Sequence, residues 1–482
     1  MQSSSVGPAP RFLCRPQPSE RFVLPSVHLF DPSLGLDTVG DLVVGDGRIE
    51  AVGAGAARPD GAEVLQAYQG CTVFPGFVDM HAHLRSPGQE YKEDVASASR
   101  AAAAGGYVMV VGMGNTKPPV DSGPLAAWIL EQAVLGADVL VGQVGAVSRG
   151  LRGEELAELR ELVDAGVVAF SDDGQPVADS DLLLNALRYL RGTGRPLLLH
   201  LEDRSLSIGG AMHEGAWSAR LGIRGIPGAA ESGPLAQALE VLRHTCREVE
   251  TSATPGGVAT SATPGGAGTP ATPVHFQHLS AADSVRLVGQ AKSEGLPVTA
   301  EVSPHHLLLT DERVRSFDQN LKINPPLRSV TDREALVAGL AGGTIDCAAT
   351  DHAPHAPHEK EVPFEDAPFG TVGLETAFAA LYGGLVAPGR LGVVTDGRLP
   401  LTRLIDALSA APCRCLGIEA PRLEAGAPAR FCVVDLDEEW VVGPGDLAGK
   451  SRNSAFLGEK VQGRVVMTVV EGARRFVRER SA

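Results

Sequence analysis

The stretch Val73-Phe-Pro-Gly-Phe-Val-Asp-Met-His-Ala-His83 begins as a short apolar run and ends in two histidines. A run of this length predicts a buried β-strand over residues 73–78. Side chains two apart on a strand project to the same side, so His81 and His83 can reach one ion together. We therefore interpret this stretch as a strand that carries metal-binding side chains at its carboxyl end.

Seven further apolar runs follow this strand and alternate with helix-like segments. They span residues 107–111, 139–144, 167–170, 196–199, 274–277, 297–302 and 345–349. Amphipathic stretches at 93–104, 154–164 and 280–294 lie between some of them. Eight strands that alternate with helices predict a parallel sheet, and the number eight favours a closed (β/α)₈ TIM barrel.

The regions outside these runs predict a second, smaller domain. Residues 41–52 contain an Asp46-Gly47 turn between two apolar runs, which is typical of a β-hairpin, and β-type patterns return near the C-terminus. We therefore expect an α/β protein in which residues 73–414 form the barrel, while 22–72 and 415–482 together form a small β-sandwich domain. Residues 1–21 are expected to be a disordered tail. The Thr/Pro/Gly-rich residues 251–272 are expected to be a flexible insertion before the sixth strand.

Composition restricts the possible partners. The 482-residue chain has a formal net charge of −16, which disfavours nucleic acid and anionic membranes and requires a local cationic pocket for any anionic substrate. Its first twenty residues lack an apolar segment of signal-peptide length, and no run approaches a membrane span. Its seven cysteines are odd in number and scattered, unlike a disulfide framework. These features predict a cytoplasmic protein.

Five of the predicted strand ends carry side chains that bind metals, and sites in TIM barrels are built at these ends. The residues are His81 and His83, then Asp172 and Asp173, then His200, His278 and Asp351. Imidazoles and carboxylates together suit zinc or a similar divalent ion, so this pattern predicts a metal site. His275, three residues before His278, is expected to face the opposite way and to pack against helices.

Six motifs carry a family resemblance. They are Gly76-Phe-Val-Asp-Met-His-Ala-His-Leu-Arg-Ser-Pro-Gly88, Phe170-Ser-Asp-Asp-Gly174, His200-Leu-Glu-Asp203, Lys322-Ile-Asn-Pro-Pro-Leu-Arg328, Ala349-Thr-Asp-His-Ala-Pro-His355 and Ala367-Pro-Phe-Gly-Thr-Val-Gly-Leu-Glu-Thr376. Together they resemble the amidohydrolase superfamily and, within it, the bacterial dihydroorotases, from about residue 22 to the end. The resemblance implies one or two Zn²⁺ ions per subunit and a homodimer, and it leaves a complex with aspartate transcarbamoylase open.

Carried over to matching positions, the resemblance assigns the metal ligands. It makes His81, His83 and Asp351 the ligands of one ion, His200 and His278 the ligands of a second, and Asp173 the bridging carboxylate. Asp173 is preferred to Asp172 because its spacing from His200 fits the family pattern. Many relatives bridge their metals with a carboxylated lysine, but residues 167–175 contain no lysine. A carboxylate bridge is therefore expected here.

The same resemblance implies the reaction, which is the reversible hydrolysis of (S)-dihydroorotate to N-carbamoyl-L-aspartate in pyrimidine biosynthesis. A hydroxide formed from metal-bound water attacks the ring carbonyl, and Asp351 acts as general base and then as general acid. Arg85 lies two residues beyond His83, and its guanidinium can grip a carboxylate. The expected substrate contacts are Arg85, Asn115, Asn324, His355, Phe369 and Gly370, and residues 355–370 could close as a lid. Ser86 departs from the family, which usually has Glu at this position.

Two other functions stay open. Hydantoinases and allantoinases open related rings, but they typically carry the bridging lysine and lack a clamp of the Arg85 type. A non-catalytic dihydroorotase-like subunit of aspartate transcarbamoylase would have lost metal ligands, whereas every expected ligand is present in this chain. Activity on dihydroorotate, hydantoin and allantoin, measured together with metal content, discriminates between the three.

Overall fold

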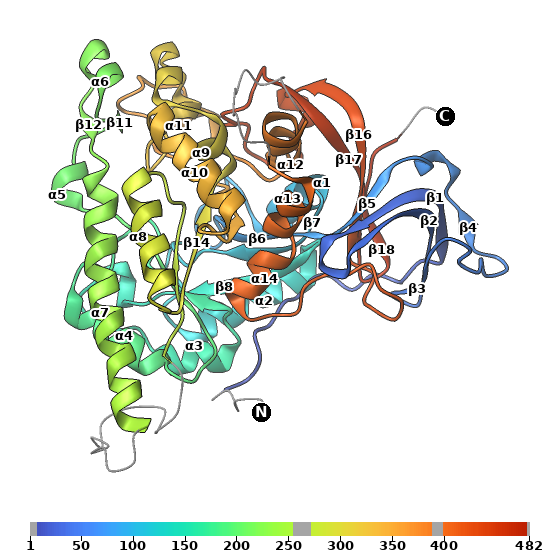
Figure 1. Ribbon diagram of the computed structural model, residues 1–482, viewed down its shortest axis with the longest axis horizontal. Coiled ribbons are helices and arrows are strands. Elements are labelled where there is room, and N and C mark those ends of the chain that lie inside the picture. The colour runs from blue at the N-terminus through green and yellow to red at the C-terminus, as the bar shows by residue number, and fades with distance from the viewer. Residues whose placement is uncertain (1–6, 254–270, 388–398, 480–482) are drawn as a thin grey trace.

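The computed structural model describes residues 7–253, 271–387 and 399–479, which form a parallel barrel and a mainly antiparallel sheet beside it (Figure 1). The barrel strands follow the order β15-β14-β13-β10-β9-β8-β7-β6, so each strand lies next to its successor in the chain. A bridge between Ala82 and His352 joins the two ends of this order. The strands are β6 (Phe77–Ala82), β7 (Tyr107–Gly112), β8 (Leu140–Gly145), β9 (Ala169–Phe170), β10 (Leu197–Leu199), β13 (Val274–Phe276), β14 (Val298–Val302) and β15 (Cys347–Ala348). The predicted TIM barrel is confirmed.

Many of the helices around the barrel have one apolar face, which they bury against it. In α4, for example, Leu183, Ala186, Leu187 and Leu190 are buried at helical spacing. The helices are α1 (Val95–Ala104), α2 (Gly123–Gly136), α3 (Leu159–Ala165), α4 (Ser180–Leu190), α5 (Arg204–Ser207), α6 (Ala216–Leu221), α7 (Ala229–Ala253), α8 (Ala282–Ser293), α9 (Pro304–Leu308), α10 (Val330–Gly342), α11 (Pro357–Lys360), α12 (Ala377–Leu381), α13 (Leu401–Leu408) and α14 (Ala410–Leu416). A short ladder of β11 (Met212–His213) and β12 (Gly225–Ile226) lies between α5 and α7 in sequence. Among the described residues, none of these helices has the length and apolar character needed to cross a membrane.

The two terminal regions share one sheet, in the order β18-β17-β16-β5-β1-β2-β3 with β4 beside β1. Antiparallel pairing of β5 with β16 joins the N-terminal and C-terminal parts, as predicted. The apolar side chains of Leu29, Val73 and Phe431 belong to the separate core of this domain. Its strands are β1 (Phe22–Asp31), β2 (Leu36–Gly45), β3 (Arg48–Gly53), β4 (Glu63–Val64), β5 (Thr72–Pro75), β16 (Phe431–Val441), β17 (Lys460–Val470) and β18 (Ala473–Val477).

The run predicted as one strand over residues 73–78 is two strands that belong to different sheets. It ends the small sheet as β5 and begins the barrel as β6, with Gly76 between them. The Gly76 N–H donates to the carbonyl of Arg430, whereas the N–H of Phe77 donates to the carbonyl of Gly106. A Cβ at position 76 would lie 2.3 Å from the Val108 side chain, so the crossing between the sheets requires glycine.

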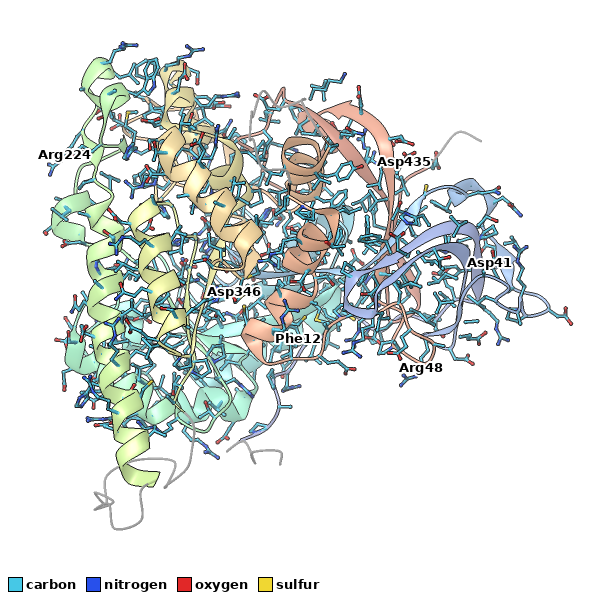
Figure 2. The ribbon with its side chains drawn as sticks, viewed as in Figure 1. Phe12, Asp41, Arg48, Arg224, Asp346 and Asp435 are labelled. Carbon is cyan, nitrogen blue, oxygen red and sulfur yellow. The ribbon has the colours of Figure 1, made fainter. Side chains whose placement is uncertain are left out.

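The N-terminal segment expected to be disordered is ordered from Gly7 onward, and that prediction is wrong for residues 7–21. Leu13 forms an antiparallel bridge to Val141 at the start of β8, with N–H···O distances of 3.0 and 2.8 Å. Phe12 packs against the barrel core (Figure 2). These contacts need only backbone groups and one aromatic ring, which leave no periodic pattern in the sequence.

The Thr/Pro/Gly-rich segment lies between α7 and β13, the position predicted for it. Residues 254–270 of this segment are outside the described residues. Its first three residues continue helix α7 to Ala253, and the buried Thr272 donates through its hydroxyl to the carbonyl of Leu187. The helix and the fixed end therefore both reach further into the segment than predicted.

Candidate active site

The six predicted metal ligands converge at the carboxyl ends of the barrel strands. His81 lies in β6, and the others follow β6, β9, β10, β13 and β15 within three residues. Each of the six residues is at most 6% exposed: His81, His83, Asp173, His200, His278 and Asp351. A parallel barrel brings these ends together at one mouth, which explains how residues far apart in sequence become neighbours.

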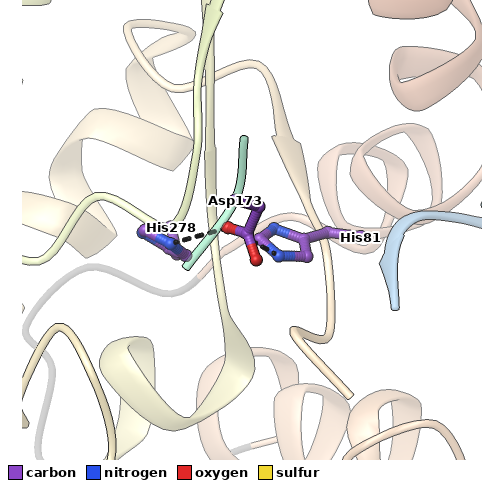
Figure 3. A group of neighbouring side chains, drawn as sticks. All are labelled: His81, Asp173 and His278. Carbon is purple, nitrogen blue, oxygen red and sulfur yellow. Dashed lines mark ion pairs between the residues drawn. The ribbon is translucent and has the colours of Figure 1, made fainter. Parts of the chain in front are cut away.

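Asp173 lies at the centre of the group. Its Oδ1 is 3.4 Å from His81 Nε2, 3.6 Å from His200 Nδ1 and 3.6 Å from His278 Nε2. Figure 3 shows this carboxylate between the rings of His81 and His278. Its other oxygen, Oδ2, is 3.5 Å from His83 Nε2. A carboxylate that faces two sets of imidazoles through its two oxygens has the geometry of a bridging ligand.

Asp351 lies beside His81, in β6, and His83, the residue after β6. Its Oδ1 lies 3.1 Å from His83 Nε2 and 3.6 Å from His81 Nε2. The ligand atoms of His81, His83 and Asp351 all lie within 4.8 Å of one another, as do those of His81, Asp173 and His278. The chain thus offers two overlapping groups of three ligands, which share His81.

Unpartnered polar atoms support the fit of a divalent cation. His81 Nε2 and Asp173 Oδ1 are buried and have no hydrogen-bond partner within the described parts of the chain. Such atoms are costly in a folded protein unless a ligand, an ion or water satisfies them. Neutral imidazole and carboxylate form the donor set that suits zinc and similar metals. The residues therefore fit a metal of this class.

Asp172, the alternative to Asp173, is engaged elsewhere. Its carboxylate accepts hydrogen bonds from the backbone N–H groups of Val147 at 2.8 Å and Ser148 at 3.0 Å, and from the Ser148 hydroxyl. These contacts draw it away from the histidines and toward the loop after β8. The geometry therefore favours Asp173 as the ligand, as the sequence spacing does.

Glu301 is a functional residue that sequence reasoning missed. It lies in β14, and its carboxylate accepts from His81 Nδ1 at 2.6 Å and from His275 Nε2 at 3.2 Å. His275 therefore points into the barrel and not toward the helices, so the prediction from residue parity was wrong. Parity fails because the chain turns after β13, where His278 has a φ of 32°. A lone carboxylate in the apolar run 297–302 was the available signal.

Two other carboxylates support the site from outside. Asp79 accepts from the backbone N–H groups of His81 and Thr350, each at 3.1 Å. Glu202 Oε2 lies 3.5 Å from His200 Nε2, on the side of the ring opposite Asp173. Ring and backbone contacts of this kind orient metal ligands.

Charge is balanced within this buried cluster. Burial alone would raise the pKa of Asp351, but its hydrogen bond to His83 and the charge of His81 lower it to about 2. Burial would lower the pKa of His200, but Asp173 and Glu202 raise it to about 9. The pKa of Glu301 lies well below its usual range because His81 and His275 outweigh the effect of burial. The carboxylates are therefore ionised at neutral pH and available to a cation.

Three of the predicted site residues have left-handed backbone conformations. The φ angles are 59° at Arg85, 32° at His278 and 48° at Asp351. Residues other than glycine adopt this region only when surrounding contacts hold them there, and such residues gather at functional sites. Each lies where the chain leaves a barrel strand and turns toward the mouth.

A cavity of about 240 Å³ opens above the cluster. Its lining contains all six predicted substrate contacts and five of the six predicted metal ligands. These residues are His83, Arg85, Asn115, Asp173, Gly174, His200, His278, Asn324, Asp351, Ala353, His355, Phe369 and Gly370. The structure thus brings the two predicted sets of residues together around one volume.

Arg85 provides a cation in this cavity. Its Nε donates to the carbonyl of Pro354 at 3.2 Å, and no carboxylate of the described residues lies within 4.0 Å of its guanidinium nitrogens. Burial lowers its pKa, but an arginine remains charged at neutral pH. The guanidinium is therefore free to pair with an anion in the cavity.

The other predicted contacts are partly engaged with the protein. Asn115 Oδ1 lies 2.9 Å from His83 Nδ1, so this amide orients a metal ligand as well as lining the cavity. His355 Nε2 donates to the carbonyl of Phe369 at 2.8 Å, which ties the segment before α11 to the end of the loop. Burial, together with the charges of Arg85 and Lys360, lowers the pKa of His355 to about 3. The ring is therefore neutral.

Ser86 stands where the resembling family usually has Glu, and a nearby carboxylate occupies the region. The Ser86 hydroxyl donates to Glu90 Oε1 at 3.2 Å, and the Gly88 N–H donates to the same oxygen at 2.8 Å. Glu90 thus supplies a carboxylate to this turn, four residues later in the chain.

Comparisons with known proteins identify the family of this chain. The model of the amidohydrolase family matches residues 72–474. The chain is 44% identical to a dihydroorotase of Geobacter sp. (strain M21) over 445 residues, which are 92% of this chain and 96% of that protein. It is also 44% identical to a dihydroorotase of Anaeromyxobacter dehalogenans (strain 2CP-C) over 447 residues, 92% and 95% of the two chains.

Solved structures share the fold at lower identity. The L-hydantoinase (dihydropyrimidinase) from Arthrobacter aurescens superposes with a TM-score of 0.78 at 23% identity, covering 95% of this chain and 96% of that one. The dihydropyrimidinase from Brevibacillus agri NCHU1002 gives 0.75 at 19% identity, covering 95% of each. The fold and the sequence matches together show that this chain belongs to the amidohydrolase family, in its dihydroorotase group, and is a cyclic-amide hydrolase.

Proposed function

We propose that this chain catalyses the reversible hydrolysis of (S)-dihydroorotate to N-carbamoyl-L-aspartate, a step of pyrimidine biosynthesis, and that it uses Zn²⁺. The observation that carries this proposal is Arg85, whose unpaired guanidinium lines the same cavity as the metal ligands. Both dihydroorotate and N-carbamoyl-aspartate carry a carboxylate. A chain of net charge −16 repels anions at long range, so a local cation is required to bind them.

The absence of a bridging lysine supports this substrate over a hydantoin or allantoin. Asp173 is the bridging ligand in this proposal, because its Oδ1 lies 3.6 Å from both His200 Nδ1 and His278 Nε2 and its Oδ2 lies 3.5 Å from His83 Nε2. Hydantoinases and allantoinases typically place a carboxylated lysine there. The solved hydantoinases resemble this chain in fold at 23% identity or less, which carries no statement about substrate.

The ligands assigned to the first ion are His81, His83 and Asp351, and those assigned to the second are His200 and His278, with Asp173 between them. A bound ion polarises the ring carbonyl and acidifies water. Asp351 is ionised, because its pKa is about 2, and it can accept the proton of the attacking water. The same carboxyl group then delivers the proton to the ring nitrogen as the amide bond breaks.

Orientation of the substrate falls to the residues that line the cavity. Arg85 can bind the substrate carboxylate through two parallel N–H···O bonds. His355, whose Nε2 donates to the Phe369 carbonyl, lines the same cavity. Asn324 also lines the cavity and can offer its amide to the ring. Holding the ring carbonyl beside Asp351 converts a slow bimolecular hydrolysis into a reaction within one complex.

The decisive experiment measures turnover of dihydroorotate, hydantoin and allantoin by zinc-loaded protein and by its Asp351→Asn variant. We expect turnover of dihydroorotate alone, with kcat reduced about 10²- to 10⁴-fold in the variant. Asp283→Asn, an exposed change on α8, serves as the matched control and should leave kcat unchanged.

Other outcomes identify the alternatives. Turnover of hydantoin or allantoin without dihydroorotate would make the chain a different ring-opening enzyme. A protein without bound metal and without any of the three activities would match a non-catalytic subunit of aspartate transcarbamoylase. Homodimer formation and binding of aspartate transcarbamoylase remain predictions, which light scattering of the chain alone and in mixture would test.

A further inference from the structure

Glu301 contacts several residues of the candidate metal centre through one carboxylate. It is 1% exposed and lies on β14, between β13 and β15 in the barrel. Its Oε1 accepts from His81 Nδ1 at 2.6 Å and from the backbone N–H of His278 at 3.2 Å, while its Oε2 accepts from His275 Nε2 at 3.2 Å. One carboxylate therefore touches a ligand from each of the two proposed metal positions.

The contact with His81 selects the tautomer of that ring. An ionised carboxylate can only accept hydrogen bonds, so the proton of a neutral His81 must be on Nδ1. The lone pair is then on Nε2, the nitrogen that faces Asp173 and Asp351 at 3.4 and 3.6 Å. Without Glu301 the ring could place its proton on either nitrogen, and only one of the two forms can bind a metal at Nε2.

The contact with His278 holds the backbone and not the ring. His278 has a φ of 32°, a conformation that costs free energy for a residue with a side chain. Its N–H is bound to the Glu301 carboxylate, and the next N–H, of Leu279, donates to the Glu301 carbonyl at 2.9 Å. Both bonds fix the turn that directs the His278 ring toward Asp173.

His275 gives the carboxylate its third donor and belongs to this support. His275, Glu301 and Cys347 also lie close enough together to resemble a separate metal site. However, both Glu301 oxygens already accept hydrogen bonds, and His275 Nδ1 lies 2.8 Å from the Thr299 hydroxyl. We therefore interpret His275, Glu301 and Cys347 as residues that support the site and not as ligands of a further metal.

We propose that Glu301 is a positioning residue that fixes the ligands of both metal positions at once, through the ring of His81 and the backbone of His278. This role rests on the proposed metal-dependent function. The proposed role of Glu301 differs from that of Glu202. Glu202 Oε2 lies 3.5 Å from His200 Nε2, so this carboxylate supports the second metal position alone. The two carboxylates form a matched pair for experiment.

The test compares Glu301→Gln with Glu202→Gln, each purified with zinc and then exposed to a chromophoric chelator. We expect Glu301→Gln to weaken every bound zinc equivalent by about 10- to 100-fold, and Glu202→Gln to weaken at most one equivalent. Zinc release by Glu301→Gln at the wild-type rate would overturn the proposal. Equal weakening of all equivalents by the two variants would also overturn it, because it would show a general loosening of the site.

A second measurement does not need bound metal. In the metal-free protein, amide hydrogen exchange should become faster at His278 in Glu301→Gln, whereas Leu279, bonded to the backbone carbonyl of residue 301, serves as the internal reference. Unchanged exchange at His278 would contradict the proposal even if the wild type binds no zinc. If the wild type binds no zinc, the proposed function fails, but hydrogen exchange at His278 still tests the role of Glu301.

A less disruptive variant covers the case in which Glu301→Gln does not fold. Glu301→Asp keeps the charge and draws the carboxylate back by one methylene group. We expect it to fold, to lengthen the contacts to His81 and His278 together, and to raise the zinc release rates to values between those of the wild type and those expected for Glu301→Gln. Wild-type release rates in this variant would count against the proposal.

Discussion

The carboxylate of Asp79 accepts a 3.1 Å hydrogen bond from the backbone N–H of Thr350, which lies 271 residues later in the chain. The Thr350 hydroxyl donates to the same carboxylate. Asp79 belongs to β6 and Thr350 follows β15, so this contact lies where the first and last barrel strands meet. It also connects the residue two before His81 to the residue before Asp351, and thereby couples closure of the barrel to the placement of two proposed metal ligands.

Replacing Asp79 should therefore destabilise the fold and the site together. Asp79→Ala leaves three buried donors without an acceptor: the N–H groups of His81 and Thr350, and the Thr350 hydroxyl. Each unsatisfied buried group costs about 1–3 kcal/mol, so we expect an overall loss of about 3–5 kcal/mol in the free energy of unfolding. Urea denaturation of the metal-free protein measures this loss. A loss below about 1 kcal/mol would show that water replaces the carboxylate.

The neighbouring aspartates Asp172 and Asp173 should separate metal binding from stability. Asp173→Asn removes the charge that faces the histidines, so we expect the zinc content to fall by at least one equivalent. Asp172→Asn disturbs the bonds to Val147 and Ser148, so we expect a loss of about 2 kcal/mol in stability with the zinc content retained. Elemental analysis and thermal unfolding of both variants check the pair. The reverse assignment would be established if Asp172→Asn lost the metal and Asp173→Asn kept it.

The sequence predicted the parts of this molecule that have a local pattern. Apolar runs predicted the barrel, and the parity of His81 and His83 predicted that both side chains lie at its mouth, because strand geometry repeats every two residues. The role of Glu301 was not predicted, because its partner His81 lies 220 residues away and a single carboxylate in a strand forms no periodic pattern. The division of the run 73–78 at Gly76 was not predicted either, because the strands of both sheets are equally apolar there.

The loop that follows Asp351 should be held in place by Glu359. Its Oε1 lies 2.8 Å from Lys92 Nζ, and its Oε2 accepts from the backbone N–H of Ala356 at 2.9 Å. We expect Glu359→Gln to raise KM for the anionic substrate about tenfold with kcat nearly unchanged, because a charge-assisted hydrogen bond contributes about 1.5–3 kcal/mol. Steady-state kinetics measure the two constants. The exposed Glu361→Gln is the control, and an equal effect of both changes would assign the rise in KM to lost charge alone.

The Lys92–Glu359 pair also predicts a pH dependence of stability. Burial would raise the pKa of Glu359, but the hydrogen bond to Lys92 lowers it from 4.5 to about 2. A lowered carboxyl pKa contributes stability above the unfolded value, and this contribution is lost as the pH falls from 4.5 toward 2. The difference in Tm between wild type and Glu359→Gln should therefore be largest near neutral pH and shrink over this range. A difference that is constant with pH would contradict the ion pair.

The N-terminal segment should stabilise the barrel without taking part in catalysis. Its backbone bonds reach Ala137, Val141 and Gly166, which lie at the amino ends of β8 and β9. The metal-binding mouth is formed by the carboxyl ends, on the opposite side of the barrel. Deletion of residues 1–16 should therefore lower Tm by several degrees and leave kcat unchanged at temperatures where the variant is folded.

A point substitution refines this expectation. Phe12 packs against Gly142. A Cβ at position 142 would lie 2.6 Å from the Phe12 ring, so glycine at this position of the strand leaves room for the ring. Phe12→Ala should cost about 2 kcal/mol, less than a fully buried phenylalanine because the ring is only partly buried. Arg11→Ala keeps the backbone bond to Gly166 and should cost less. If instead the deletion lowered kcat or zinc content in the folded protein, the segment would have to act on the mouth through the strands, and its role would not be confined to stability.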